Sequence, residues 1–191
     1  MKKLIAKTIA ISLAIVIGLI SVIYLLIASF SPAMLSNIYF RLNNKNLTLK
    51  YSEIAYQKSE QIESLSTLVE RSIKFDDNAL TEKYGFIFIT HSDYEDLLTK
   101  KDSGYNYYIV GSLCEALYCS NKKETAITLA FENTLVYSSV NPIRVVISLA
   151  VENGDINLLS TIKQKLESRE NKNQSILNDI TLITNYINER S

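Results

Sequence analysis

The sequence predicts an all-α protein in which an N-terminal transmembrane helix is followed by a short α-solenoid of helical hairpins and a C-terminal capping helix. Residues 9–30 form an uncharged apolar run. The chain has only five Gly and two Pro among 191 residues, whereas all-β folds need these residues for many tight turns. After residue 31, apolar residues recur at spacings of three and four, which is typical of amphipathic helices.

The charge balance argues against a nucleic-acid partner. The chain has 20 basic and 20 acidic residues. Because Lys2, Lys3 and Lys7 precede the apolar run, residues 31–191 carry 17 basic and 20 acidic residues, a net charge of −3. Nucleic-acid binding depends on a basic surface, and this part of the chain has no basic excess. The richness in Ile, Asn, Lys and Tyr is typical of AT-rich bacterial genomes.

The apolar run is long enough to cross a membrane. As a helix it would rise about 33 Å, and the hydrocarbon core of a bilayer is about 30 Å thick. A cleaved signal peptide is the alternative, since Ser29 and Ser31 form a small-x-small site, but Pro32 would follow the cut directly. The run also exceeds the roughly 7–15 apolar residues of a typical signal peptide. We therefore interpret residues 1–30 as a basic start plus an uncleaved signal anchor that spans the membrane at 9–30.

The lysines before the span predict its orientation. The next basic residue after them is Arg41, and cytoplasmic flanks of membrane helices carry the excess of Lys and Arg. We therefore expect a single-pass protein of the cell membrane. Its N-terminus would lie in the cytoplasm, and residues 31–191 would form an extracytoplasmic domain.

Residues 31–60 have the pattern of an αα-hairpin. Ser31 and Pro32 suit the N-cap and the first turn of a helix, so a helix is expected directly after the span, without a flexible linker. Asn43 and Asn44 interrupt the apolar spacing, and a second amphipathic stretch follows. Two short helices joined by a few residues form such a hairpin.

Residues 35–56, LSNIYFRLNNKNLTLKYSEIAY, resemble a tetratricopeptide repeat. The residues that fit the family pattern are Leu35, Ser36, Tyr39, Tyr51 and Ala55. The departures are Asn43 in place of Gly at the turn and Thr48 in place of Ala at the start of the second helix. The resemblance implies hairpins that stack into a solenoid, and generic helical-hairpin packing is the alternative.

Further copies of this repeat pattern match the family less well. A shift of 33 residues, against a family period of about 34, places Leu68, Thr81 and Tyr84 at equivalent positions. The expected elements of the domain are hairpins at about 31–60, 61–92, 104–137 and 141–169 and a capping helix at 174–190. The residues 91–103 between the second and third hairpins are expected to be a helix extension plus a polar surface loop. Part of the fourth hairpin, LAVENGDINLL, also resembles an ankyrin repeat, but the earlier segments do not.

The fourth hairpin has the clearest boundaries. Asn141-Pro142 suits a helix start, and Asn153-Gly154 suits a helix end with a left-handed residue. Asp155 suits the N-cap of the next helix. In the third hairpin, the small residues expected to permit close helix contact are Gly111, Ala116, Ala126 and Ala130.

In the repeat family, the first helix of each hairpin lines a concave groove that binds extended peptides or partner helices. By register, the resemblance therefore implies a partner-binding groove formed by Asn37, Arg41, Glu70, Lys74 and Glu115. The mixed charges of this set argue against the basic clamp that some members use for a terminal carboxylate.

No motif for catalysis or metal binding is present. His91 lies beside Asp93 and Glu95 and is interpreted as part of a polar loop, since a metal site needs three or more convergent ligands. Cys114 and Cys119 would lie about 140° apart on one helix with a rise of about 7.5 Å, which exceeds disulfide reach. They are interpreted as two buried thiols, and a dyad of either with His91 is the catalytic alternative. We expect no catalytic residue, no metal and no cofactor.

Tyrosines cluster in the third hairpin. They are Tyr105, Tyr107, Tyr108 and Tyr118. They are interpreted as core and half-core side chains whose polar tips reach water, and a binding face is the alternative.

Taken together, these patterns predict a non-catalytic, membrane-tethered protein–protein interaction or scaffold module. Its partner would be a protein or peptide on the extracytoplasmic side. An accessory structural subunit of a membrane complex is one alternative, and an envelope hydrolase is another.

Overall fold

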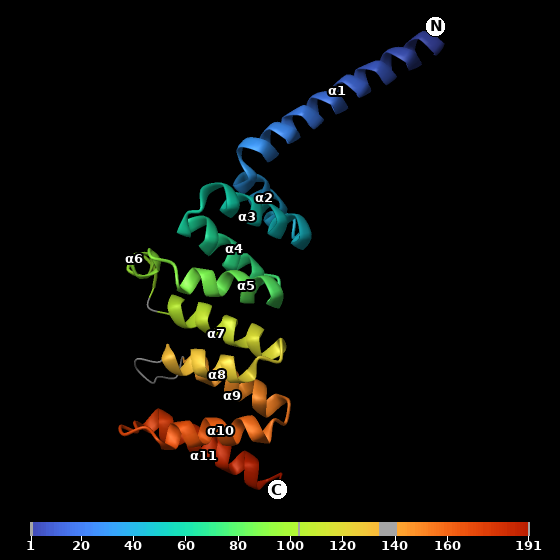
Figure 1. The fold of residues 1–191 in the computed structure, drawn as a ribbon. Helices are drawn as coiled ribbons and strands as arrows, with labels where there is room; N and C mark the ends of the chain where they lie inside the picture. Colours follow the sequence, from blue (N-terminus) through green and yellow to red (C-terminus); the bar gives the residue numbers. More distant parts are fainter. Residues whose placement is uncertain (1, 103, 134–140, 191) are drawn as a thin grey trace. The chain divides into compact units, whose positions relative to one another are not determined.

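A computed structural model describes residues 2–102, 104–133 and 141–190, and these residues form eleven α-helices and no strand (Figure 1). The predicted all-α class is therefore confirmed. The helices are α1 (Lys2–Phe30), α2 (Pro32–Arg41), α3 (Lys45–Ser59), α4 (Ile62–Lys74), α5 (Asn78–Ile89), α6 (Tyr94–Leu98), α7 (Tyr105–Cys119), α8 (Lys123–Glu132), α9 (Pro142–Glu152), α10 (Ile156–Glu167) and α11 (Gln174–Asn188). The expected end of the third hairpin, near residue 137, lies outside the described residues.

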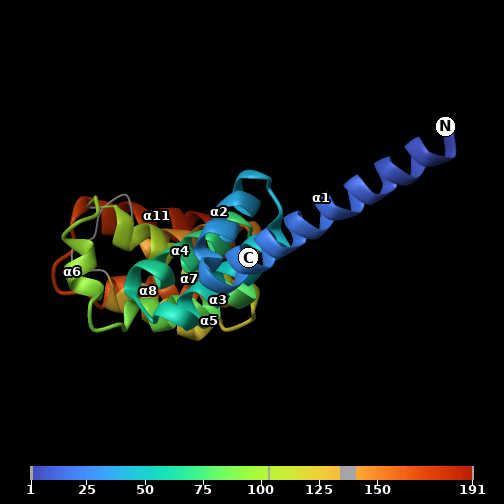
Figure 2. The same cartoon turned by 90° about the horizontal axis from the view of Figure 1, so that it is seen from above.

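The first helix is long and apolar enough to span a membrane, as the sequence predicts. The stretch Ile11–Phe30 has a mean hydropathy of 2.8, and none of it is buried. Figures 1 and 2 show α1 as one uninterrupted helix that leads into α2. A helix that is apolar on all sides needs apolar surroundings, which the hydrocarbon of a bilayer would provide.

Packing contacts divide the chain into two compact units, Met1–Arg71 and Ser72–Ser191, and the division falls within α4. In the first unit, α2 packs along α3 and contacts α1. Asn43 adopts a left-handed backbone with φ of 52°, which asparagine tolerates better than most residues. Asn44 then caps α3 by accepting a hydrogen bond from the Leu47 N–H. The predicted break between these two helices is therefore confirmed.

The apolar helix is joined closely to the hairpin that follows it. Ser31 occupies the N-cap of α2 and Pro32 its first turn, as the sequence predicts. The hydroxyl oxygens of Tyr24 and Tyr51 lie 2.5 Å apart. The Tyr51 ring also stacks on Tyr39, with the ring centroids 5.8 Å apart. One residue of backbone and a tyrosine cluster thus connect α1 to α2 and α3.

In the second unit, consecutive helices pack against one another. α7 packs against α5, α8 and α9, and further contacts join α8 to α9, α9 to α10 and α10 to α11. Figure 1 shows α7 to α11 following one another in sequence order. The small residues expected at close helix contacts are all buried: Gly111, Ala116, Ala126 and Ala130. Buried side chains from five helices, α7 to α11, form the core, among them Leu113, Leu117, Ile127, Ile143, Leu159 and Ile183.

The predicted caps of the fourth hairpin are confirmed. Asn141 Oδ1 accepts a hydrogen bond from the N–H two residues on, at 3.0 Å. Asp155 Oδ1 accepts one from the Leu158 N–H at 3.1 Å, and Gly154 has a φ of +66°. Asp155 also pairs with Lys123 of α8, at 2.6 Å. The hydrogen bond from Lys123 holds the pKa of this carboxyl below its usual value, so one aspartate both caps α10 and joins it to α8.

The segment after α5 differs from the expected surface loop. Residues 94–98 form the short helix α6, in which Tyr94 and Leu97 are buried. The Tyr94 ring packs edge-on against Phe88, with centroids 5.0 Å apart. Its hydroxyl donates a hydrogen bond to Asn106 Oδ1 at 2.7 Å, and burial raises its pKa to about 12. Two buried side chains therefore anchor a segment whose composition is mostly polar.

The last helix covers α10 and is fixed to α9 by an ion pair. Ile176 and Ile183 of α11 are buried. Asp179 is only 6% exposed, and both of its oxygens receive the Arg144 guanidinium of α9. Nε lies 2.9 Å from Oδ2, and Nη2 lies 2.8 Å from Oδ1. Bidentate pairs of this kind are among the stronger hydrogen-bonded contacts in proteins.

Asp179→Ala is expected to lower the free energy of unfolding by about 2 kcal/mol, because it leaves the Arg144 guanidinium partly buried without a carboxylate. The measurement is urea unfolding of the full chain in detergent micelles, followed by circular dichroism. Lys163→Ala is the control, since Lys163 pairs with Glu167 at 3.8 Å on the surface of α10. Such surface pairs contribute less than about 0.5 kcal/mol. Equal effects of the two substitutions would contradict the structural role of Asp179.

Candidate functional site

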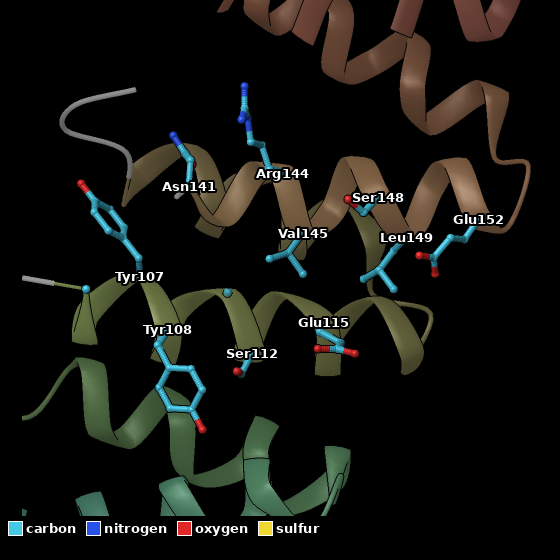
Figure 3. Close-up of a pocket in the computed structure, with 12 residues that line it drawn as sticks. Tyr107, Tyr108, Ser112, Glu115, Asn141, Arg144, Val145, Ser148, Leu149 and Glu152 are labelled. Carbon is cyan, nitrogen blue, oxygen red and sulfur yellow. The ribbon is translucent and has the colours of Figure 1, made fainter. Parts of the chain in front are cut away.

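A groove of about 620 Å³ lies between α7 and α9 (Figure 3). Side chains from both helices line it, among them Tyr108, Ser112 and Glu115 of α7 and Val145, Ser148 and Glu152 of α9. In each helix these residues are three or four positions apart, so they share one face. Most other side chains of α7 are buried against its neighbours, so the groove residues form much of the part of α7 that remains at the surface.

Gly111 allows the two helices to approach closely at the floor of the groove. A Cβ atom at this position would lie 3.3 Å from Cγ2 of Val145, which is tighter than ordinary van der Waals contact. A larger residue would therefore push α9 away from α7. Val145 and Leu149 of α9 provide apolar surface beside this contact.

The chemical type of the side chains that line the groove changes along its length. Figure 3 shows Glu115 and Glu152 toward one end and Tyr107 toward the other. Both carboxylates are exposed. The guanidinium of Arg144 is directed to Asp179 in the ion pair described above. One end of the groove is therefore acidic and the other end is aromatic, and the middle combines apolar Val145 and Leu149 with the hydroxyls of Ser112 and Ser148.

Comparison with known protein families, curated proteins and solved structures finds no match.

The five residues expected to line a partner-binding groove lie in different places. Glu115 lines the groove between α7 and α9. Asn37 lines a smaller cavity in the first unit, where it accepts a hydrogen bond from Arg71. Arg41 is exposed in the last turn of α2. Two further members lie on α4: Glu70, which is half-buried and accepts a hydrogen bond from Ser66, and Lys74, which is exposed.

The groove residues of α9 were not predicted from the sequence. No residue of the fourth hairpin was expected to line a groove, although Asn141-Pro142 marks the helix start clearly. Ser148 and Glu152 follow from the same helical register once that start is fixed. The tyrosine cluster divides between two environments. Tyr105 and Tyr118 are buried as expected, and Tyr107 and Tyr108 line the groove.

The remaining reactive side chains are dispersed. Within residues 2–102, 104–133 and 141–190, no group of three or more His, Cys, Asp or Glu residues is arranged to hold a metal ion. His91 Nδ1 accepts a hydrogen bond from the Asp93 N–H at 3.1 Å. Cys114 is buried as expected, and burial raises its pKa to about 12. Cys119 is exposed, so the expectation of two buried thiols is wrong for this residue.

The two thiols are expected to differ sharply in reactivity. A maleimide reacts with an accessible thiolate, so at pH 7.5 the folded protein should be labelled at Cys119 and not at Cys114. The measurement is mass spectrometry of peptides from the labelled protein, with and without denaturant. Cys119→Ser should abolish labelling of the folded chain, and denaturant should restore it at Cys114. Rapid labelling of Cys114 in the folded protein would contradict the packing of α7.

Proposed function

We propose that this chain is a single-pass, membrane-tethered protein–protein interaction module. It has no catalytic role in this proposal, and it takes a protein or peptide partner rather than a nucleic acid. Its N-terminus lies in the cytoplasm, and residues 31–191 form a short α-solenoid of tetratricopeptide-like hairpins on the extracytoplasmic side. The observation that carries the proposal is the groove between α7 and α9, which is acidic at one end, aromatic at the other and partly apolar between them.

The order of packing in the second unit supports the solenoid. α7 pairs with α8, α9 pairs with α10, and α7 also contacts α9. Contact between the first helices of successive hairpins is what repeat stacking requires, because each hairpin buries its apolar face on the next. α11 then covers α10, in the manner of a terminal cap.

The chemistry of the groove indicates the kind of partner segment that would fit. Glu115 and Glu152 favour a Lys or Arg side chain, and the apolar floor favours an aliphatic or aromatic one. Tyr107 and Tyr108 offer large amphipathic surfaces of the type common at protein interfaces. The proposed ligand is therefore an extended or helical peptide that carries a basic residue near an apolar one.

A stripe on α2 supports the membrane tether. Met34, Ile38 and Leu42 are four residues apart, and all three are exposed, Leu42 by 68%. Exposed apolar residues at this spacing share one helix face, and Phe30 at the end of α1 is exposed as well. We infer that this stripe lies in the bilayer interface, as amphipathic helices beside membranes do. The interface would then extend one helix beyond the span.

The proposed orientation is tested with Cys119. In spheroplasts of a bacterial host that express the full chain, a membrane-impermeant maleimide should label Cys119 without permeabilisation, because α7 would lie outside the cell. Cys119→Ser should remove the signal. Labelling that requires permeabilisation would place the domain in the cytoplasm and contradict the proposed topology.

The groove itself is tested by peptide selection on the full chain in detergent micelles. Selected peptides should be enriched in Lys or Arg next to apolar residues. Glu115→Lys and Glu152→Lys should each weaken binding of a selected peptide about tenfold or more, since they replace attraction with repulsion. Glu189→Lys, at the exposed end of α11, is the matched control and should leave binding unchanged. Selection of acidic peptides, or equal effects of all three substitutions, would overturn the assignment of the groove.

A further inference from the structure

The first unit contains a buried arginine whose hydrogen-bond acceptors are all neutral. Arg71 of α4 is 8% exposed. Its Nη1 donates to Ser36 Oγ and, at 3.0 Å, to Ser52 Oγ, and its Nη2 donates to Asn37 Oδ1. The guanidinium also lies over the Phe40 ring, with Cζ 5.2 Å from the centroid. These contacts position the side chain between α2, α3 and α4 without neutralising its charge.

The two serine hydroxyls that contact the arginine have no proton left to donate to another group, and neither carries a negative charge. Ser36 Oγ donates its single proton to the Thr48 carbonyl at 2.7 Å. In the contact between Ser36 and Ser52, at 2.6 Å, Ser52 must therefore be the donor. Both oxygens are then acceptors toward Arg71. Burying a cation is costly unless an anion accompanies it, and burial lowers the pKa of Arg71, against which the charge of Glu70 acts.

A cavity of about 190 Å³ lies beside this guanidinium. It is lined by Arg71 together with polar side chains of three helices, namely Asn37, Ser52, Glu63, Ser64 and Thr67. An arginine has five N–H donors, and the contacts above use three of those of Arg71. The Thr67 hydroxyl donates to the Glu63 carbonyl at 2.9 Å, whereas the Ser64 hydroxyl accepts from Ser59 and keeps its own proton. The remaining donors of Arg71, with the hydroxyl of Ser64, form the set of groups that typically binds phosphate oxygens.

We propose that this cavity binds a phosphate group, held by Arg71 and the hydroxyl of Ser64. The phosphate would place a negative charge directly against the buried guanidinium, whose hydrogen-bond acceptors are neutral. Glu63 also lines the cavity, but it is exposed, so its carboxylate opposes binding from the mouth and keeps the affinity modest.

The position of the cavity on α2 indicates two sources for the phosphate. Ala33 and Asn37 line it, and each is one position before a member of the apolar stripe, Met34 and Ile38. One position is about 100° around a helix, so the cavity lies at the edge of the face assigned to the bilayer interface. Two sources of the phosphate fit this position, a phospholipid headgroup and a free ion. The lipid source rests on the proposed membrane tether, and the phosphate site itself does not.

The site is tested with the full chain in alkyl maltoside micelles, which contain no phosphate. Inorganic phosphate should raise the thermal unfolding midpoint, by about 3 °C at a tenfold excess over the dissociation constant. Sodium chloride at equal ionic strength should not. Ser64→Ala should weaken phosphate binding about tenfold by removing one donor to an anion. Ser160→Ala is the matched control, because Ser160 is likewise a half-buried helical serine and lies in α10, outside the cavity.

A second substitution separates binding from folding. Arg71→Met should abolish the phosphate effect but also removes the contacts between α2, α3 and α4. Glu63→Gln leaves those contacts intact and should tighten phosphate binding about threefold or more, since it removes a repulsive charge. A purely structural role for Arg71 predicts no such gain. The site is overturned if phosphate acts no more strongly than chloride, or if Ser64→Ala and Ser160→Ala bind phosphate equally.

Mixed micelles distinguish the two sources. Phosphatidylglycerol should raise the unfolding midpoint more than a phosphate-free glycolipid does if the ligand is a lipid headgroup, and Ser64→Ala should remove the difference. Equal effects of the two lipids, with inorganic phosphate still active, would assign the site to the free ion. Neither result depends on the groove between α7 and α9, so the two proposals fail independently.

Discussion

The second unit depends on the burial of α7. This helix packs against α5, α8 and α9, and side chains along most of its surface, such as Ile109, Leu113 and Leu117, are almost fully buried. A helix surrounded on three sides has one narrow face left for polar residues, and Ser112 and Glu115 lie on it. The groove is therefore a consequence of core packing. The same contacts that stabilise the unit also fix the position of its candidate binding surface.

Much of the fold was predictable because its signals are local. Asn141 and Asp155 cap helices through their own side chains, and the apolar run of α1 needs no partner to be recognised. The predictions that were wrong concern the burial of side chains, which depends on segments distant in the sequence. Cys119 lies about 140° around α7 from Cys114, so one buried face could not hold both. Residues 91–103 are mostly polar by composition, although two side chains of α6, Tyr94 and Leu97, were enough to anchor them.

The polar cavity in the first unit could not have been found from the sequence in the same way. A lone arginine in an amphipathic helix is usually a surface residue. The burial of Arg71 depends on Ser36, Asn37 and Ser52, which come from two other helices and lie 19 to 35 positions away in the sequence. The sequence indicates only a family-pattern position for Ser36 and a groove position for Asn37. Their role as hydrogen-bond acceptors becomes visible when the three helices are assembled.

The junction at Ser31 has a mechanical consequence. One residue separates α1 from α2, and the hydroxyl contact between Tyr24 and Tyr51 joins α1 to α3 at a second point. Two attachments leave little freedom for a hinge. If α1 tilts to match a thicker or thinner bilayer, α2 and α3 must turn with it. The orientation of this hairpin above the lipid would then follow the thickness of the membrane, so the first unit would act as a rigid lever.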